Sequence, residues 1–185
     1  MYGFFVPLVL GFTVSGVSAF TAAFSRRFGE HGGQMATMIL RNLVGIPLWA
    51  AGYILAWQAS TPWLFASGPA VRITGWLLIV TGSIPVILGH LQLGWRTHMP
   101  SVRDTLVRTG LYGRVRHPIY AGGLLIFPGL VLIRPTSAVA AASALGLLWV
   151  ILQARLEELD LVQRLPAYRQ YMREVPRFVP RASRR

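Results

Sequence analysis

The chain contains no cysteine and no lysine among its 185 residues. Without cysteine it forms no disulfide and offers no thiolate metal ligand or thiol nucleophile. Its four histidines include no His-Glu-x-x-His pair, so we expect no metal site. The phosphate-binding P-loop and the Gly-x-Gly-x-x-Gly dinucleotide pattern are also missing. These absences exclude cysteine-based catalysis and give no sign of a metal site or of a common nucleotide-binding loop.

Charge is scarce as well. Only 13% of the residues are charged whereas 54% are hydrophobic, a composition typical of a chain embedded in lipid. One crossing needs about 20 apolar residues. The length therefore predicts a single all-α domain over residues 1–185, an integral membrane helical bundle of about five transmembrane helices with a cytoplasmic C-terminal helical tail.

Five apolar runs are bounded by arginine, proline, glycine or polar residues. They predict spans at 4–24, 38–58, 73–93, 118–133 and 136–154. The fourth run is short and contains Pro128, so we expect it to be kinked, tilted or incompletely spanning. In the first run, Gly11, Ser15 and Ala19 form a row of small residues that favours close helix packing.

The arginines are unevenly distributed between the connections. They fill the first and third connections and the tail from Arg155 to Arg185, whereas only Arg72 and Arg134 lie in the others. Because positive charge is enriched in cytoplasmic loops, we predict an inner (plasma) membrane protein of bacterial type with its N-terminus outside and its C-terminus in the cytoplasm. No basic segment precedes the first run, which we expect to be a retained span and not a secretory signal.

The formal net charge of +12 suggests a negatively charged partner, either nucleic acid or anionic lipid. The arginines flank apolar runs and are not interleaved with exposed aromatic residues or a nucleic-acid-binding motif. Anchoring to anionic membrane lipids explains them more simply. We therefore expect membrane lipids and no nucleic acid as partners, and the oligomeric state stays open.

A first candidate segment precedes the fourth apolar run. Its residues of interest are Gly110, Tyr112, Arg116, His117, Pro118 and Tyr120. Proline suits the first turn of a helix, so a helix N-terminus is expected beside the histidine, where it favours an anion such as a small-molecule carboxylate. The alternative is that the arginine and histidine are ordinary membrane-interface residues.

A second candidate segment follows the last apolar run. On a helix Arg155 and Glu158 lie three residues apart and can pair, while Glu157 lies on another face. Two adjacent carboxylates directly below a span are costly unless they are solvated, paired or used. An ordinary salt-bridge cluster is the alternative. Further on, residues 168–180 resemble an amphipathic segment that returns to the interface and covers a site.

Taken in order, the motifs resemble the isoprenylcysteine carboxyl methyltransferase family and its bacterial phospholipid-methyltransferase-like relatives. The resemblance covers about residues 105–180: Leu-Val-x-x-Gly-x-Tyr-x-x-x-Arg-His-Pro-x-Tyr, then Arg-x-Glu-Glu-x-x-Leu, then Tyr-x-x-Tyr and Val-Pro-Arg-Phe-x-Pro. It implies an all-helical membrane enzyme that holds S-adenosylmethionine on the cytosolic side, with a lipophilic acceptor, isoprenoid-like or lipid, entering from the bilayer.

The resemblance also implies roles for individual residues. Arg155 or Glu158 would orient the acceptor as catalytic residues. The implied cofactor-binding residues are Gly110, Tyr112, Arg116, His117, Pro118, Tyr120, Glu157 and Glu158. One departure concerns the turn after the second segment, where the family usually has Phe-Gly and this chain has Leu165-Pro166.

Methyl transfer is an in-line displacement, so the protein mainly aligns donor and acceptor and excludes water. Arg155 would position a carboxylate acceptor, which is already nucleophilic. An amine or hydroxyl acceptor would have to lose a proton, which makes His117 or Glu158 a candidate base. Two alternatives remain open: a membrane reductase that uses a nicotinamide cofactor, and a non-catalytic lipid-binding membrane protein.

Overall fold

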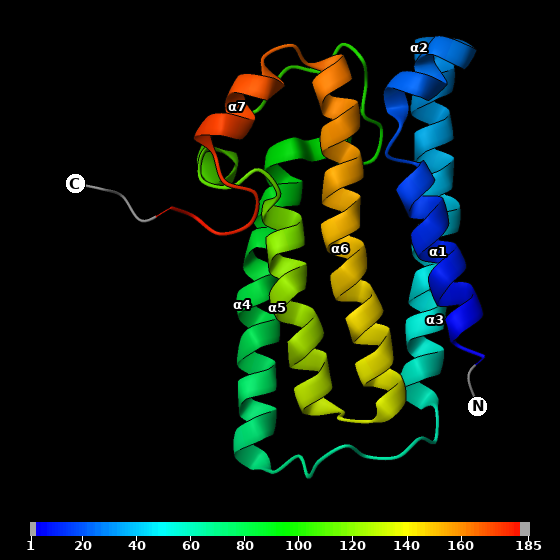
Figure 1. Cartoon of the computed structure of the whole chain (residues 1–185), viewed down its shortest axis with the longest axis vertical. Coiled ribbons are helices and arrows are strands. Elements are labelled where there is room, and N and C mark those ends of the chain that lie inside the picture. Colours follow the sequence, from blue (N-terminus) through cyan, green and yellow to red (C-terminus); the bar gives the residue numbers. More distant parts are fainter. Residues whose placement is uncertain (1–2, 182–185) are drawn as a thin grey trace.

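The structure is a computed structural model that describes residues 3–181. Its elements in chain order are α1 (Phe5–Val17), α2 (Thr21–Met38), the π-helix η1 (Ile39–Gly45), α3 (Ile46–Gln58), α4 (Pro69–Leu93), the 3-10 helices η2 (Gly94–Thr97) and η3 (Gly110–Gly113), α5 (Pro118–Ile133), α6 (Ser137–Arg164) and α7 (Tyr168–Glu174). Figure 1 shows α3, α4, α5 and α6 side by side along the long axis, with α7 at one end. The predicted all-α bundle is confirmed.

Three helical stretches in the described part of the chain are long and apolar enough to cross a membrane: Thr21–Gln58, Pro69–Thr97 and Ser137–Arg164. The shorter helices α1 and α5 are also apolar. On α4, large hydrophobic side chains such as Leu77 and Leu91 are exposed on the outer face. In a soluble protein such an apolar face would have to be covered by a binding partner. In an integral membrane protein it lies against lipid.

The apolar run expected to cross at 4–24 is not one continuous helix. The chain leaves the helical path between α1 and α2, where the Ser18 hydroxyl donates to the Ser15 carbonyl oxygen at 2.6 Å. Asp160 of α6 then accepts a hydrogen bond from the Ala22 amide at 2.7 Å and so satisfies a free N–H at the start of α2. Polar groups inside the bundle thus stabilise a break that hydrophobicity alone does not reveal.

A second interruption lies within α2. Gly29 has φ 74° and ψ 168°, a conformation that a residue with a Cβ rarely adopts. Figure 1 shows the chain reversing direction in α2 at the end of the bundle that carries α7. The stretch from Thr21 to Gln58 is therefore a bent element, with its first part continuing the direction of α1 and its remainder running back through η1 and α3.

The row of small residues in α1 faces the returning helix. A Cβ on Gly11 would lie 2.3 Å from the Trp49 amide nitrogen, and one on Gly45 would lie 2.3 Å from the Ser15 hydroxyl. Both contacts are shorter than any real Cβ makes, so the close packing expected from Gly11 and Ser15 is present. Beyond it, Phe12 stacks on Trp149 of α6 with ring centroids 4.9 Å apart, which joins the N-terminal hairpin to the rest of the bundle.

Helices α4 and α5 pack with their backbones in contact. A Cβ on Gly82 would lie 2.6 Å from the Gly122 carbonyl oxygen, and a Cβ on Gly75 would lie 2.8 Å from that of Gly129. The glycines are seven residues apart on each helix, so they recur on one face and meet their partners in antiparallel register. This seam positions the start of α5, where the first candidate segment ends.

Replacing Gly82 with alanine should therefore force α4 and α5 apart. Because the obstructing atom belongs to the backbone, we expect the free energy of unfolding to fall by about 2 kcal/mol, within the usual cost of overpacking. Thermal or denaturant unfolding of detergent-purified protein measures the change. Gly68→Ala is the matched control, since a Cβ there meets nothing within 4 Å. Equal stability of the two variants would contradict a tight seam.

Candidate functional site

A cavity of about 600 Å³ lies inside the bundle, within the size range of small-molecule sites. Its walls come from α3, α4, α5 and α6, and the connection between α4 and α5 covers its end near α7. Polar side chains, among them Arg41, His117 and Glu157, line that end. The opposite part is apolar and includes Phe127 and Leu130. The cavity is thus divided into a polar end and an apolar part.

Glu158 lies behind the polar end and is only 4% exposed. Its Oε1 accepts hydrogen bonds from Arg116 Nε at 2.9 Å and His117 Nε2 at 3.2 Å, while its Oε2 accepts one from Arg177 Nη2 at 2.6 Å. A buried carboxylate is stable only when it is paired and hydrogen-bonded in this way. Both oxygens are therefore occupied by donors from the residues that lead into α5 and from the segment after α7.

Glu157, the preceding residue, has different surroundings. It lines the cavity, and its Oε1 accepts hydrogen bonds from the Tyr120 hydroxyl at 2.6 Å, from Arg41 Nη2 at 3.0 Å and from Gln153 Nε2 at 3.3 Å. Its Oε2 lies 3.9 Å from His117 Nδ1. One carboxylate oxygen is thus held by three donors while the other lies toward the histidine.

His117 lies between the two carboxylates and is 6% exposed. Its ring stacks on that of Tyr120 with centroids 5.6 Å apart. Because the Glu158 carboxylate only accepts hydrogen bonds, His117 Nε2 carries the hydrogen that joins them. The position of Nδ1 then leaves it directed toward Glu157 at the cavity wall.

The segment after α7 is bound to the start of α5. The Arg116 amide donates to the Pro176 carbonyl oxygen at 2.9 Å, and the His117 amide donates to that of Arg177 at 3.0 Å. Arg116 Nη1 also donates to the carbonyl oxygen of Met172 at 2.9 Å and to that of Val175 at 2.5 Å, near the C-terminal end of α7. Arg116 therefore uses its whole guanidinium to hold α6, α7 and the tail together.

Two tyrosines of α7 close the site from above. Tyr168 and Tyr171 are buried and line the cavity. Burial raises the pKa of Tyr171 to about 12 even though the nearby Arg116 and Arg108 guanidinium groups oppose the shift. Its hydroxyl therefore stays protonated and donates to the Tyr112 carbonyl oxygen at 2.5 Å. Likewise, the hydrogen bond to Glu158 raises the pKa of Arg177, which keeps that side chain charged.

The structure brings most of the sequence-predicted residues together. Those that line the cavity are Tyr112, Arg116, His117, Tyr120 and Glu157. Glu158 lies behind them, joined to Arg116 and His117. Pro118 is buried at the first turn of α5, as a helix-starting proline, and does not line the cavity.

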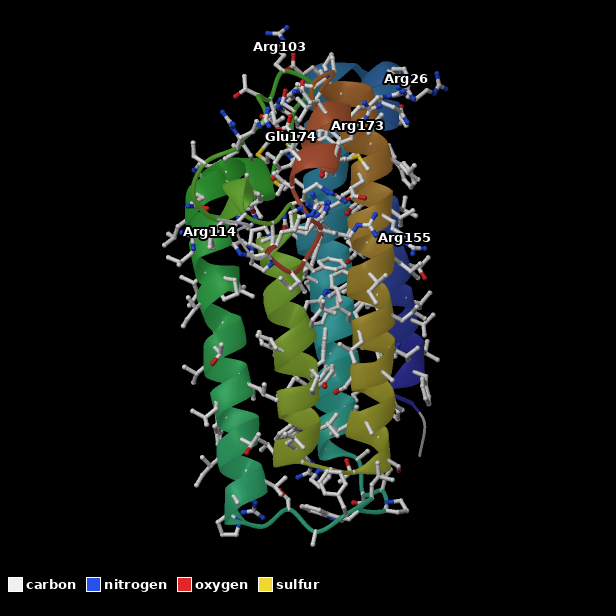
Figure 2. The ribbon with its side chains drawn as sticks, turned by 60° about the vertical axis from the view of Figure 1, so that its left-hand side comes forward. Arg26, Arg103, Arg114, Arg155, Arg173 and Glu174 are labelled. Atoms are coloured by element: carbon white, nitrogen blue, oxygen red, sulfur yellow. The ribbon has the colours of Figure 1, made fainter. Side chains whose placement is uncertain are left out.

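Two predicted residues lie away from the cavity. Gly110 has φ 58° and begins η3, where the following amide of Leu111 donates to Gln92 Oε1 at 3.1 Å, so its role is in the turn. Arg155 is exposed on α6 (labelled in Figure 2). The expected pair of Arg155 with Glu158 is not formed, because Glu158 is directed to the three donors inside the bundle.

Sequence reasoning missed three residues of the site. Gln153 is one helical turn before Glu157, and a polar residue within an apolar run was a usable signal. Arg177 stands in the Val-Pro-Arg-Phe element but had no assigned contact. Arg41 gave no signal beyond its positive charge, since its partners Thr97 and Glu157 are more than 50 residues away in sequence.

Several buried polar atoms on lining residues have no hydrogen-bond partner. They are Trp49 Nε1, Trp149 Nε1, Gln153 Oε1, Ser15 Oγ and Tyr168 OH. Such atoms are costly unless a bound molecule or water satisfies them. Together with Glu157 they suit a ligand that carries both donors and acceptors. Among residues 3–181, no group of three or more histidines or carboxylates is arranged to hold a metal ion.

Replacing Glu158 with glutamine should destabilise the site strongly. The variant leaves the buried Arg116 and the partly buried Arg177 without their counter-charge, so we expect the free energy of unfolding to fall by about 3 kcal/mol. Chemical denaturation in detergent measures it. Glu174→Gln is the control, because Glu174 pairs with Arg108 at the surface with a side chain 42% exposed and should change stability by about 1 kcal/mol or less. A Glu158 variant as stable as the control would contradict the central role of this carboxylate.

The chain is similar in sequence to several known proteins. It is 27% identical over 166 residues to a methanethiol S-methyltransferase of a Pseudomonas species, which covers 81% of this chain and 61% of the relative. It is 34% identical over 110 residues to the cobalt-zinc-cadmium resistance protein CzcN of Cupriavidus metallidurans, covering 58% and 51%. A methanethiol S-methyltransferase of Bradyrhizobium diazoefficiens is 27% identical over 136 residues, covering 67% and 45%.

The chain therefore spans less than two thirds of the length of each of these relatives. No solved structure matches it. The phospholipid methyltransferase family model matches residues 70–167, more than half of the chain and the part that contains both candidate segments. This match confirms the resemblance inferred from the motifs: the chain belongs to the phospholipid methyltransferase family.

Proposed function

We propose that the chain is an S-adenosylmethionine-dependent methyltransferase acting on an acceptor with an apolar part. The observation that carries this proposal is the single cavity that joins the polar end around Glu157 and His117 to the apolar part around Phe127. Transfer between a polar donor and a lipophilic acceptor requires both environments in one water-excluding space. The family membership supports the same reaction class.

The polar end suits the proposed cofactor. Bound S-adenosylmethionine would supply an electrophilic methyl group on a sulfonium. In our proposal the Glu157 carboxylate accepts hydrogen bonds from the ligand's hydroxyl or amino groups and offsets its positive charge. Tyr120 and Gln153 orient that carboxylate, and the rings of Trp149 and Tyr120, which meet edge to face with centroids 6.1 Å apart, exclude water.

The acceptor would enter between α3 and α4. Among residues 3–181, α3 packs on α1, η1 and α6 whereas α4 packs on α5, η2 and η3, so these two helices form no substantial interface with each other. Ile46 and Ile54 of α3 and Val86 of α4 nevertheless line the cavity, and both isoleucines are exposed at the outer surface. This arrangement supports lateral access for a lipophilic molecule from the bilayer.

Sulfur is the acceptor atom that we would test first, because two of the relatives are named methanethiol S-methyltransferases. A thiol, an amine or a hydroxyl must lose a proton as the methyl group is transferred. Of the two candidate bases, His117 lines the cavity, whereas both oxygens of Glu158 already accept hydrogen bonds, from Arg116, Arg177 and His117 itself. We therefore assign proton acceptance to His117, with Glu158 holding its ring in place.

Calorimetric binding of S-adenosylmethionine and of its demethylated product to detergent-purified protein tests the cofactor. We expect saturable binding that Glu157→Gln weakens roughly tenfold, since a hydrogen bond between charged groups is replaced by a neutral one. His117→Ala should weaken cofactor binding by less than tenfold, yet abolish methyl transfer to a thiol with an apolar chain. Glu174→Gln, outside the cavity, is the control for both readouts.

A nicotinamide dinucleotide serves as the competing ligand in the same titration. Binding of the nicotinamide cofactor, with no binding of S-adenosylmethionine by folded protein, would favour the reductase alternative. Folded protein that binds neither compound would favour a non-catalytic lipid-binding role. Either result would overturn the proposed reaction.

We also propose that the end carrying α7 faces the cytoplasm. Figure 2 shows Arg26, Arg103 and Arg173 together at this end, which fits the enrichment of positive charge on that side. Since the chain has no cysteine, single variants report sidedness directly. A membrane-impermeant maleimide should label Ser60→Cys in intact cells and label Thr109→Cys only after permeabilisation. The reverse pattern would overturn the orientation.

A further inference from the structure

The helical path between α2 and α3 contains a π-helix. The element η1 (Ile39–Gly45) carries Arg41, and π-helical turns are rare features that frequently occur at functional sites. This position lies outside residues 70–167, the part that the family model matches. Neither of the two candidate segments includes Arg41. Nevertheless, the Arg41 side chain lines the polar end of the cavity.

Arg41 contacts three separate parts of the molecule. Its Nε donates to the Ser18 hydroxyl at 3.2 Å, at the break between α1 and α2. Its Nη1 donates to the Thr97 carbonyl oxygen at 3.2 Å, and its Nη2 donates to Glu157 Oε1 at 3.0 Å. The side chain is 17% exposed. One planar guanidinium thus joins the N-terminal hairpin, the end of η2 and the carboxylate of the cavity.

The neighbouring Asn42 strengthens the second of these contacts. Its Nδ2 donates to the His98 carbonyl oxygen at 3.4 Å, and its Oδ1 lies 3.3 Å from His98 Nδ1. Residues 97–98 begin the connection whose continuation, including Pro100 and Leu106, lines the cavity at its polar end. We call this connection, residues 97–107, the cover. Residues 41–42 of η1 therefore hold the first residues of the cover.

We propose that Arg41 is a positioning residue that couples closure of the cover to the orientation of Glu157. The inference rests on the proposed function, since it assumes that Glu157 binds the cofactor. With Thr97 and Glu157 bound to the same guanidinium, the carboxylate is oriented when the cover is closed. Lifting the cover removes the Thr97 acceptor and frees the guanidinium to move, which weakens one of the three hydrogen bonds that orient the carboxylate.

Arg41 and Arg116 both line the cavity, but they end on different carboxylates. Arg116 donates from Nη1 to two backbone carbonyl oxygens and from its other nitrogens to Glu158, which lies behind the cavity wall. Arg41 instead ends on Glu157, the carboxylate that lines the cavity. A change at Arg41 is therefore transmitted to the ligand-binding surface, whereas the contacts of Arg116 mainly hold elements together.

The test compares Arg41→Gln and Arg41→Lys with Arg27→Gln. Arg27 lies on α2 of the same hairpin, is exposed and does not line the cavity, so its variant removes the same charge elsewhere. Two readouts are needed: the dissociation rate of S-adenosylmethionine from the purified protein, and amide hydrogen exchange in residues 97–107. We expect Arg41→Gln to speed dissociation roughly tenfold to a hundredfold and to accelerate exchange in the cover, as loss of charge-assisted hydrogen bonds implies.

Arg41→Lys should be intermediate, because an ammonium retains the attraction to Glu157 but cannot reach three acceptors in a fork. If Arg41→Gln does not fold, Asn42→Ala replaces it, and we then expect faster exchange confined to the cover together with faster dissociation. Unchanged dissociation in a folded Arg41 or Asn42 variant would overturn the proposal, even if its thermal stability fell. Absence of S-adenosylmethionine binding by the unaltered protein would instead reject the proposed function.

Discussion

The buried Glu158 carboxylate is the interaction on which the site depends. It lies on α6, its donors Arg116 and His117 stand at the start of α5, and Arg177 comes from the tail after α7. Removing a carboxylate and its cationic partners from water is costly, and the cost is offset only while all of them remain in place. The cluster therefore joins three segments that are distant in the sequence at one end of the bundle.

Two adjacent carboxylates acquire different roles because successive residues of a helix differ by about 100° in direction. Glu158 is turned toward Arg116 and Arg177, and Glu157 is turned toward the cavity and Arg41. Their shared neighbour His117 connects the two environments. Because Glu158 is held in place by its hydrogen bonds, Glu157 on the same helical turn stays directed toward the cavity.

Sequence reasoning was most successful where the signal was local. The apolar runs predicted the helical bundle, and four residues singled out by the motif resemblance, Arg116, His117, Tyr120 and Glu157, line the cavity. The pairing of Arg155 with Glu158 was wrong, because helical spacing allows a pair but does not reveal competing donors from other elements. The breaks at Ser18 and Gly29 and the contact of Arg41 with Glu157 depend on long-range contacts and backbone conformation, which hydrophobic periodicity does not encode.

The position of the family match has a consequence for substrate choice. Residues 70–167 contribute α4, α5, α6 and both adjacent carboxylates. The remaining wall of the apolar part comes from α3, whose Ile46, Trp49 and Ile54 line the cavity outside the matched region. The family match therefore covers both carboxylates and the α5 part of the apolar wall, but not the α3 part. On the proposed function, the acceptor would also contact the α3 wall, which lies outside the matched residues, so membership in the family predicts the reaction class better than it predicts the molecule that is methylated.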